Sequence, residues 1–182
     1  ACFTETVATL GRVDACFANA GTYGGRGTKF IDYTAEEWRR VMRVNLDGAF
    51  FTLRAAARHM VARGGGGSLV GTASLAAIEG AARNEHYAAT KGGLVSMLKA
   101  MAVEFARNGI RANAILPGWI ETPMTARSTS DEKFAGNVLP RIPIRRWGQG
   151  ADFGGIAVYL ASEASAYHTG DCLIIDGGYA LY

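Results

Sequence analysis

A tyrosine and a lysine four positions apart, Tyr87 and Lys91, are the residues of this chain best suited to acid–base chemistry. On a helix this spacing puts both side chains on one face, one turn apart, so the phenol and the ammonium can point into one cleft. A phenol has a reference pKa near 10 and exchanges protons poorly at neutral pH, whereas a nearby positive charge favours the phenolate. We therefore expect Lys91, helped by a second positive charge, to lower the pKa of Tyr87 by about three units. Tyr87 would then act as a general acid/base on a carbonyl or an alcohol.

Taken alone, a tyrosine and a lysine four residues apart also occur on many solvated helices. The neighbouring residues therefore decide between an acid–base pair and an ordinary solvated helix face. Ser74 ends the apolar run 68–74, which predicts a buried strand that leads into a loop. In a parallel sheet, ligands bind at the carboxyl ends of the strands. A hydroxyl there can donate a hydrogen bond to a substrate oxygen while Tyr87 moves the proton. Without Tyr87, Ser74 would be an ordinary turn serine.

Strands and helices alternate along the chain. The expected strands cover about 13–18, 68–73, 111–116 and 172–175. The expected helices cover about 1–10, 35–62, 86–108, 131–139 and 151–162. The glycine runs 24–27 and 64–67 are expected to be a loop and a helix-to-strand connector, because adjacent glycines disfavour a helix. The pattern predicts an α/β fold, a Rossmann-like doubly wound parallel sheet with helices on both faces.

Further segments resemble the short-chain dehydrogenase/reductase family in their order and spacing. They are Ala18-Asn19-Ala20-Gly21, Val44-Asn45-Leu46, the strand and Pro117-Gly118 loop followed by Thr122, and the last strand between Thr169-Gly170 and Asp176-Gly177-Gly178. Together with Ser74, Tyr87 and Lys91 they are similar to 3-oxoacyl-carrier-protein reductases and to sugar or hydroxysteroid dehydrogenases. Ala18 departs from the family pattern, which has a second asparagine there.

The resemblance implies an NAD(P)-dependent oxidoreductase that interconverts a secondary alcohol and a ketone, with NAD or NADP carrying the hydride. The implied catalytic residues are Asn45, Ser74, Tyr87 and Lys91. The implied cofactor-binding residues are Asn19, Ala20, Gly21, Tyr87, Lys91, Pro117, Gly118, Ile120 and Thr122. Lys91 would also bond the nicotinamide ribose, and Asn45 would kink its helix and hold a water that relays protons. The plain alternative for Asn45 is a satisfied helix asparagine.

The family's glycine-rich turn, which holds the dinucleotide pyrophosphate at a helix N-terminus, has no counterpart in these residues. We therefore expect one NAD(P)-binding domain over 1–182, truncated at its N-terminus and part of a longer polypeptide. The strand at 13–18 should then be an exposed sheet edge, and residues 1–182 alone should turn over little or no substrate. The choice between NAD and NADP and the identity of the alcohol or ketone stay open.

Two other functions share part of this pattern. A catalytically silent relative could act as an oligomerising or binding subunit, although Ser74, Tyr87 and Lys91 are all present. A sugar-nucleotide epimerase or dehydratase also uses Tyr-x-x-x-Lys, but the Asp176-Gly177-Gly178 ending and the short substrate loop argue against it. Apolar sides on the helices expected at 35–62 and 86–108 predict a homo-oligomer, a dimer or a tetramer.

Composition bounds the remaining possibilities. A chain of 182 residues with 49% hydrophobic residues predicts one domain with an adequate core. The net charge of +3 is scattered, which argues against nucleic-acid binding, and the absence of a long apolar stretch argues against a membrane span. The cysteines and histidines show no metal-binding spacing, so no metal is expected. Cys16 and Cys172 are expected as buried thiols in a reducing, cytoplasmic compartment, and His86 is a weaker candidate for the cleft wall.

Overall fold

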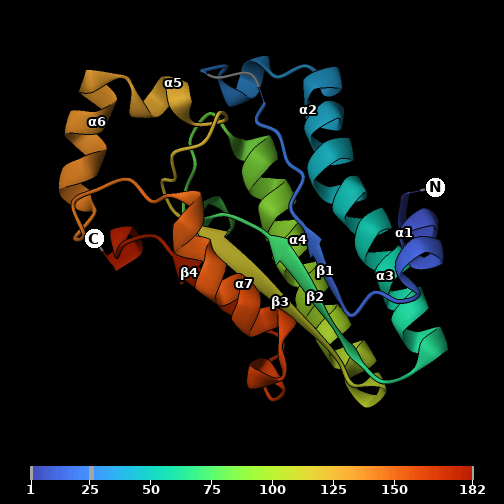
Figure 1. The fold of residues 1–182 in the computed structure, drawn as a ribbon. Coiled ribbons are helices and arrows are strands. Elements are labelled where there is room, and N and C mark those ends of the chain that lie inside the picture. The colour runs from blue at the N-terminus through green and yellow to red at the C-terminus, as the bar shows by residue number, and fades with distance from the viewer. Residues whose placement is uncertain (1, 25–26, 182) are drawn as a thin grey trace.

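One parallel sheet between two layers of helices forms the computed structural model, which describes residues 2–24 and 27–181 (Figure 1). The strands are β1 (Ala15–Ala18), β2 (Gly67–Thr72), β3 (Ile110–Pro117) and β4 (Cys172–Ile175), and they lie in that order. Every pairing is parallel, and Ala18 lies beside Gly71, which lies beside Ala114. The carboxyl ends of the strands therefore meet at one edge of the sheet.

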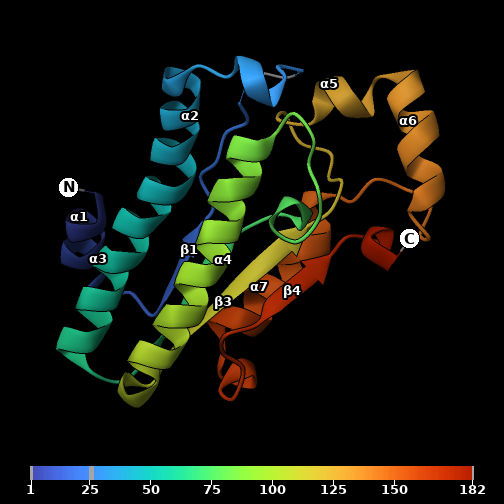
Figure 2. The ribbon, with the colours of Figure 1, turned by 180° about the vertical axis from the view of Figure 1, so that it is seen from behind.

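The helices follow the predicted alternation. They are α1 (Cys2–Leu10), α2 (Ala35–Met42), α3 (Gly48–Arg63), α4 (Glu85–Phe105), α5 (Ala126–Thr129), α6 (Glu132–Val138) and α7 (Gly154–Ala161). Helices α3 and α4 pack on one face of the sheet and α7 on the other, as the opposite views of Figures 1 and 2 show, while α1 lies outside against α3. The predicted α/β class, with a parallel sheet covered on both faces, is confirmed. The predicted glycine loop 24–27 includes Gly25 and Arg26, and the first predicted helix includes Ala1; these three residues lie outside the described ones.

Two hydrophobic clusters hold these layers together. Between the sheet and α3 and α4, Leu53, Leu69 and Leu98 are among the fully buried side chains. On the opposite face, Val70 of β2 packs with Leu160 of α7. Successive residues of a strand point to opposite faces, so Leu69 and Val70 serve different clusters. This is why apolar residues in the central strands also occupy consecutive positions, as at 69–70 and 114–116.

The predicted helix over 35–62 has an interruption. Helix α2 is capped by Thr34, whose hydroxyl accepts a hydrogen bond from the backbone of Glu37 while the Glu37 carboxylate accepts one from the Thr34 backbone. Between α2 and α3 the backbone widens into a π-helical turn, Arg43–Asp47, with Asn45 at its centre. Such turns insert one extra residue and are frequent at functional sites. The turn coincides with the position at which a kink was expected.

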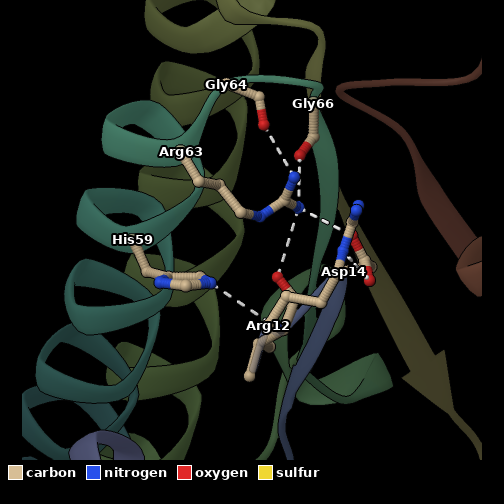
Figure 3. Close-up of polar contacts among 7 residues, drawn as sticks. Arg12, Asp14, His59, Arg63, Gly64 and Gly66 are labelled. Carbon is tan, nitrogen blue, oxygen red and sulfur yellow. Dashed lines mark hydrogen bonds and ion pairs between the residues drawn. The ribbon is translucent and has the colours of Figure 1, made fainter. Parts of the chain in front are cut away.

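The start of β1 is tied to the end of α3 (Figure 3). The Arg63 guanidinium donates to the backbone carbonyls of Val13 (3.2 Å) and Gly66 (2.8 Å) and to the Asp14 carboxylate (2.8 Å). His59 accepts a hydrogen bond from the Val13 amide at 3.2 Å. These contacts anchor the edge strand at the end of the sheet opposite to the carboxyl ends.

The strand β1 lies at an edge of the sheet, as predicted, and the exposed fraction of Phe17 on it is 36%. The thiols of Cys16 and Cys172 are only partly buried, so the prediction of buried thiols was wrong in degree. The reason is topological, because both cysteines lie on the outer strands β1 and β4, where fewer neighbours cover them.

Candidate active site

A cavity of about 750 Å³ opens at the carboxyl ends of the strands. Its lining residues are Phe17, Asn19, Gly21, Tyr23, Thr72, Ala73, Ser74, Tyr87, Lys91, Ile115, Pro117, Gly118, Ile120, Thr122, Pro123, Met124, Thr125, Gly150, Phe153 and Ala157. Ser74, predicted from one segment, and the pair Tyr87 and Lys91, predicted from another, therefore share one space. A Tyr87 side chain that pointed to bulk solvent would have excluded its interpretation as a general acid/base. Only 9% of this residue is exposed.

The first two turns of α4 position the phenol and the ammonium. Lys91 is 4% exposed, and its Nζ donates to the backbone carbonyl of Thr72, at the end of β2, at 2.6 Å. The same Nζ lies 5.4 Å from the centroid of the Tyr87 ring. The lysine therefore connects the sheet edge with the face of the tyrosine.

Burial dominates the ionisation of both groups. It raises the pKa of Tyr87 to about 12, with a further rise from Tyr23 and a smaller opposing effect from the hydrogen bond with Ser74. It lowers the pKa of Lys91 from 10.5 to about 8. The expected fall in the pKa of Tyr87 is therefore wrong for the protein without a bound cofactor. Removing both groups from water disfavours the phenolate and the ammonium more than their proximity favours them.

Ser74 stands where β2 has ended and a short 3₁₀ turn, Leu75–Ala77, begins. Its backbone is extended, and its Oγ accepts a hydrogen bond from the Ala76 amide at 3.2 Å. This cap fixes the hydroxyl oxygen at the cavity wall, where the Ser74 hydroxyl acts to lower the pKa of the Tyr87 phenol against the larger effect of burial. The predicted pairing of Ser74 with the proton-moving phenol fits this geometry.

Asn45 is 1% exposed and does not line the cavity, but it supports the loop that does. Its Oδ1 accepts a hydrogen bond from the Thr22 amide at 2.7 Å, and its Nδ2 donates to the Thr22 carbonyl at 3.0 Å. A side chain at Gly21 would bring its Cβ to 3.6 Å from both Asn45 Oδ1 and Lys91 Nζ. The asparagine thus lies directly behind the point where the loop after β1 approaches the lysine.

The residues predicted to hold a dinucleotide gather at the same cavity, with one exception. Asn19, Gly21, Pro117, Gly118, Ile120 and Thr122 line it. Ala20 is exposed and lies outside the lining. Gly118 has a packing reason of its own, because a Cβ there would lie 2.6 Å from the Asp176 Cβ. The Thr122 hydroxyl lies 3.0 Å from that of Thr125, which orients it within its loop.

Tyr23 is a cavity residue that the sequence reasoning missed. Its ring centroid lies 4.9 Å from that of Tyr87, and it stands two residues after the Asn-Ala-Gly turn. An aromatic residue so soon after a strand that ends at the site was the available signal. Met124 also lines the cavity.

His86 lies behind the cavity wall rather than in it. It is completely buried, and its Nδ1 accepts a hydrogen bond from the Tyr87 amide at 2.9 Å. The Tyr33 ring stacks on it with the ring centroids 4.5 Å apart. A Cβ on Gly24 would lie 1.5 Å from His86 Nε2, so only glycine fits. The loop after β1 is thereby packed against the first turn of α4, which carries Tyr87.

We expect Gly24→Ala to lower the free energy of unfolding by roughly 1–3 kcal/mol, because the new methyl group must displace the His86 ring. Urea denaturation measures the change. Gly80→Ala is the matched control, since a Cβ at Gly80 meets nothing within 4 Å. Equal stability of the two variants would contradict the close packing of Gly24 on His86.

The described wall of the cavity is mostly uncharged and contains one cationic side chain. Of the described residues that line it, Lys91 alone carries a charged side chain. Within 2–24 and 27–181, no group of three or more His, Cys, Asp or Glu is placed to hold a metal ion. In the same part of the chain, no helix has both the length and the apolar character to cross a membrane.

Comparison with known sequences decides the family. The sequence model described as Enoyl-(Acyl carrier protein) reductase matches residues 1–180. The L-rhamnose-1-dehydrogenase of Scheffersomyces stipitis is 39% identical over 94% of this chain and 66% of its own length. The 2-dehydro-3-deoxy-D-gluconate 5-dehydrogenase of Escherichia coli is 37% identical over 96% of this chain and 68% of its own length.

This chain belongs to the short-chain dehydrogenase/reductase family. A crystal structure of gluconate 5-dehydrogenase from Burkholderia cenocepacia, in complex with NADP and tartrate, superposes with a TM-score of 0.93 at 36% identity. That match covers 99% of this chain and 69% of the other. The predicted family, the Rossmann-like fold and the enzyme class, NAD(P)-dependent oxidoreductases acting on CH–OH groups, are confirmed. This short-chain dehydrogenase/reductase spans about two thirds of the length of the curated relatives named here.

The described residues fit a nicotinamide cofactor by their chemistry. A buried ammonium, a Pro-Gly loop and a threonine hydroxyl stand around one cavity next to the phenol. When bound, the nicotinamide would supply or accept the hydride, which none of the side chains present can do. Lys91, Pro117, Gly118 and Thr122 are the residues of this short-chain dehydrogenase/reductase that would hold it.

Proposed function

We propose that the protein carrying these residues interconverts a secondary alcohol and a ketone with NAD or NADP. The observation that supports this most is the shared cavity of Ser74, Tyr87 and Lys91, since the hydroxyl comes from the end of β2 and the phenol and the ammonium come from α4. A hydroxyl, a phenol and an ammonium around one space provide a hydrogen-bond donor, a proton carrier and a charge. Each is needed when a carbonyl oxygen gains a proton as its carbon gains hydride.

The roles follow from the position of each group. Ser74 donates a hydrogen bond to the substrate oxygen and orients it. Tyr87, whose pKa lies far above 7 and is raised further by burial to about 12, is protonated at neutral pH and gives a proton to the oxygen formed on reduction. Oxidation of an alcohol needs the opposite transfer, and positive charge next to the phenol makes that transfer easier. Lys91 supplies one such charge, and an oxidised nicotinamide would add a second.

The lining also bears on the kind of substrate. Tyr23, Ile120, Pro123 and Met124 give the cavity an apolar wall, and Lys91 is the one charged side chain among the described lining residues. These features favour a neutral, medium-sized alcohol or ketone. The relatives include dehydrogenases named for L-rhamnose and for a deoxygluconate, so neutral sugars and sugar acids belong together in the test panel.

The test is turnover with a panel of secondary alcohols and ketones, followed through the absorbance of the reduced nicotinamide with NAD and with NADP. We expect turnover from the whole protein and little or none from residues 1–182 alone, which we regard as one NAD(P)-binding domain without the pyrophosphate turn. Absence of turnover from the whole protein with every substrate and both cofactors would contradict the proposal.

The alternative is a catalytically silent oligomerising or binding subunit. It is supported by exposed apolar side chains on the helices α2, α3 and α4, among them Trp38, Phe51 and Val103, whose exposed fractions are 36%, 56% and 82%. We propose a homo-oligomer, a dimer or a tetramer, in either case. Light scattering on the sample used for the assay tests the oligomeric state, and turnover separates the two functions, because an oligomer without turnover would favour the silent subunit.

A further inference from the structure

Thr90 lies on α4 between the two residues of the acid–base pair, and its hydroxyl is engaged on both sides. The residue is completely buried. Its Oγ1 donates to the Tyr87 carbonyl at 2.7 Å and accepts a hydrogen bond from Asn45 Nδ2 at 3.2 Å. Because the only hydroxyl hydrogen is used on the carbonyl, Thr90 can only accept from Asn45. The nitrogen side of the Asn45 amide must therefore face Thr90.

The other contacts of Asn45 agree with that orientation. The Thr22 amide needs an acceptor, which is Asn45 Oδ1 at 2.7 Å, and the Thr22 carbonyl needs a donor, which is Asn45 Nδ2 at 3.0 Å. Both amide hydrogens and the amide oxygen are then used, so the plane of the Asn45 side chain is fixed from two directions. One direction is the loop after β1, and the other is Thr90 on α4.

A threonine that bonds back to its own helix is common and by itself structural. The bond from Asn45 is different, because the two residues are 45 positions apart and on different helices. Thr90 thus connects three parts of the site: the backbone of Tyr87, the π-helical turn of Asn45, and the loop residues Thr22 and Tyr23 that run along the cavity.

We propose that Thr90 is a positioning residue, which holds Asn45, and through Asn45 the loop 21–23, in a fixed place relative to Tyr87. The inference rests on the proposed function only for its effect on turnover. Its physical basis is that reacting groups lose rate steeply when their supports allow small displacements. Thr90→Val keeps the shape of the side chain and removes the hydroxyl, leaving an Asn45 amide hydrogen buried without an acceptor.

The first test needs no activity. The Thr22 amide is held by Asn45, so we expect its hydrogen exchange in the protein carrying these residues to become roughly 5- to 100-fold faster in Thr90→Val. Thr90→Ser restores the hydroxyl and should restore the exchange rate. Thr52→Val is the matched control, because Thr52 bonds back to Gly48 on α3 at 2.8 Å, away from the cavity. Unchanged exchange at Thr22 in Thr90→Val would overturn the proposal.

The second test is kinetic and uses a double-mutant cycle with Asn45→Ala. We expect Thr90→Val to lower kcat by about 10- to 100-fold with a smaller change in KM, and Thr90→Ser to recover most of the loss. If Thr90 acts through Asn45, adding Thr90→Val to Asn45→Ala should lower kcat little further. Effects of the two substitutions that simply multiply, or a failed rescue by serine, would overturn the proposal.

The variant Tyr87→Phe distinguishes a failure of the Thr90 proposal from a failure of the proposed function. If Tyr87→Phe retains turnover, the proposed function fails. If Tyr87→Phe loses turnover while Thr90→Val keeps the full kcat, only the positioning role of Thr90 is overturned. Should Thr90→Val not fold, Thr90→Ala is judged by the same exchange and kinetic criteria, because alanine suits a helix and adds no bulk.

Discussion

Tyr87→Phe is expected to lower kcat by about 10²–10⁴-fold in the whole protein, because the variant keeps the ring and loses the group that exchanges the proton. Cofactor binding should persist, since the phenylalanine ring fills the same volume. The phenol is buried and shares its cavity with Ser74 and Lys91. Turnover under saturating substrate and cofactor titration by fluorescence measure the two quantities separately.

The control for this variant is Tyr167→Phe. Tyr167 is fully exposed, so removing its hydroxyl tests the same chemical change outside the site. It should leave kcat and cofactor affinity as they are. Turnover of Tyr87→Phe within tenfold of the wild type would remove Tyr87 from the proposed chemistry, and a parallel loss of cofactor affinity would assign it to binding.

Lys91→Met is expected to separate activity from stability. We expect kcat to fall by about 10²-fold or more, because the phenol loses the adjacent cation that favours its ionised form. Stability should respond in the opposite direction at neutral pH, since the wild type must bury a charge there and the variant does not.

The pH dependence of that difference has a definite sign. The pKa of Lys91 is lowered from 10.5 in the unfolded chain to about 8 in the folded protein. Below pH 8 both states hold the proton, and the cost of burying the ammonium is fully present. Between about pH 8 and 10.5 the unfolded chain binds more protons, so the free energy of unfolding of the wild type rises with pH through this group.

From pH 7 to pH 10, the free energy of unfolding of the wild type should therefore gain roughly 2–3 kcal/mol relative to Lys91→Met. Urea denaturation of both proteins at each pH gives this double difference, in which the titrations that the two proteins share cancel. A constant difference across the range would mean that Lys91 is hydrated and keeps its ordinary pKa when the protein is folded.

The architecture was largely predictable because it depends on local patterns. Apolar runs bounded by turn residues marked the strands to within two residues, and Tyr87 and Lys91 fell on one helix face because a helix repeats every 3.6 residues. Ser74 was placed at the cavity by one rule, the binding of ligands at the carboxyl ends of parallel strands. These inferences needed no knowledge of which segments touch.

The prediction of the site was less complete where distant segments meet. Ala20 was included with its neighbours in the turn but is exposed, because successive residues of a turn point in different directions. Tyr23 was omitted because no local pattern indicated that its ring would lie on that of Tyr87. Thr90, between Tyr87 and Lys91, was not predicted as a site residue, because its hydrogen bond with Asn45 joins two different helices.

The amino-acid sequence by itself determined the order of the elements, the parallel sheet and the face of α4 on which the phenol and the ammonium lie. Only the tertiary structure decided their ionisation, with the pKa of Tyr87 raised and that of Lys91 lowered. It also decided that the His86 ring leaves room only for glycine at position 24 and that the Asn45 amide nitrogen faces the Thr90 hydroxyl. The physical reason is that desolvation and close packing arise when segments far apart in the chain exclude water together, which no spacing along the sequence expresses.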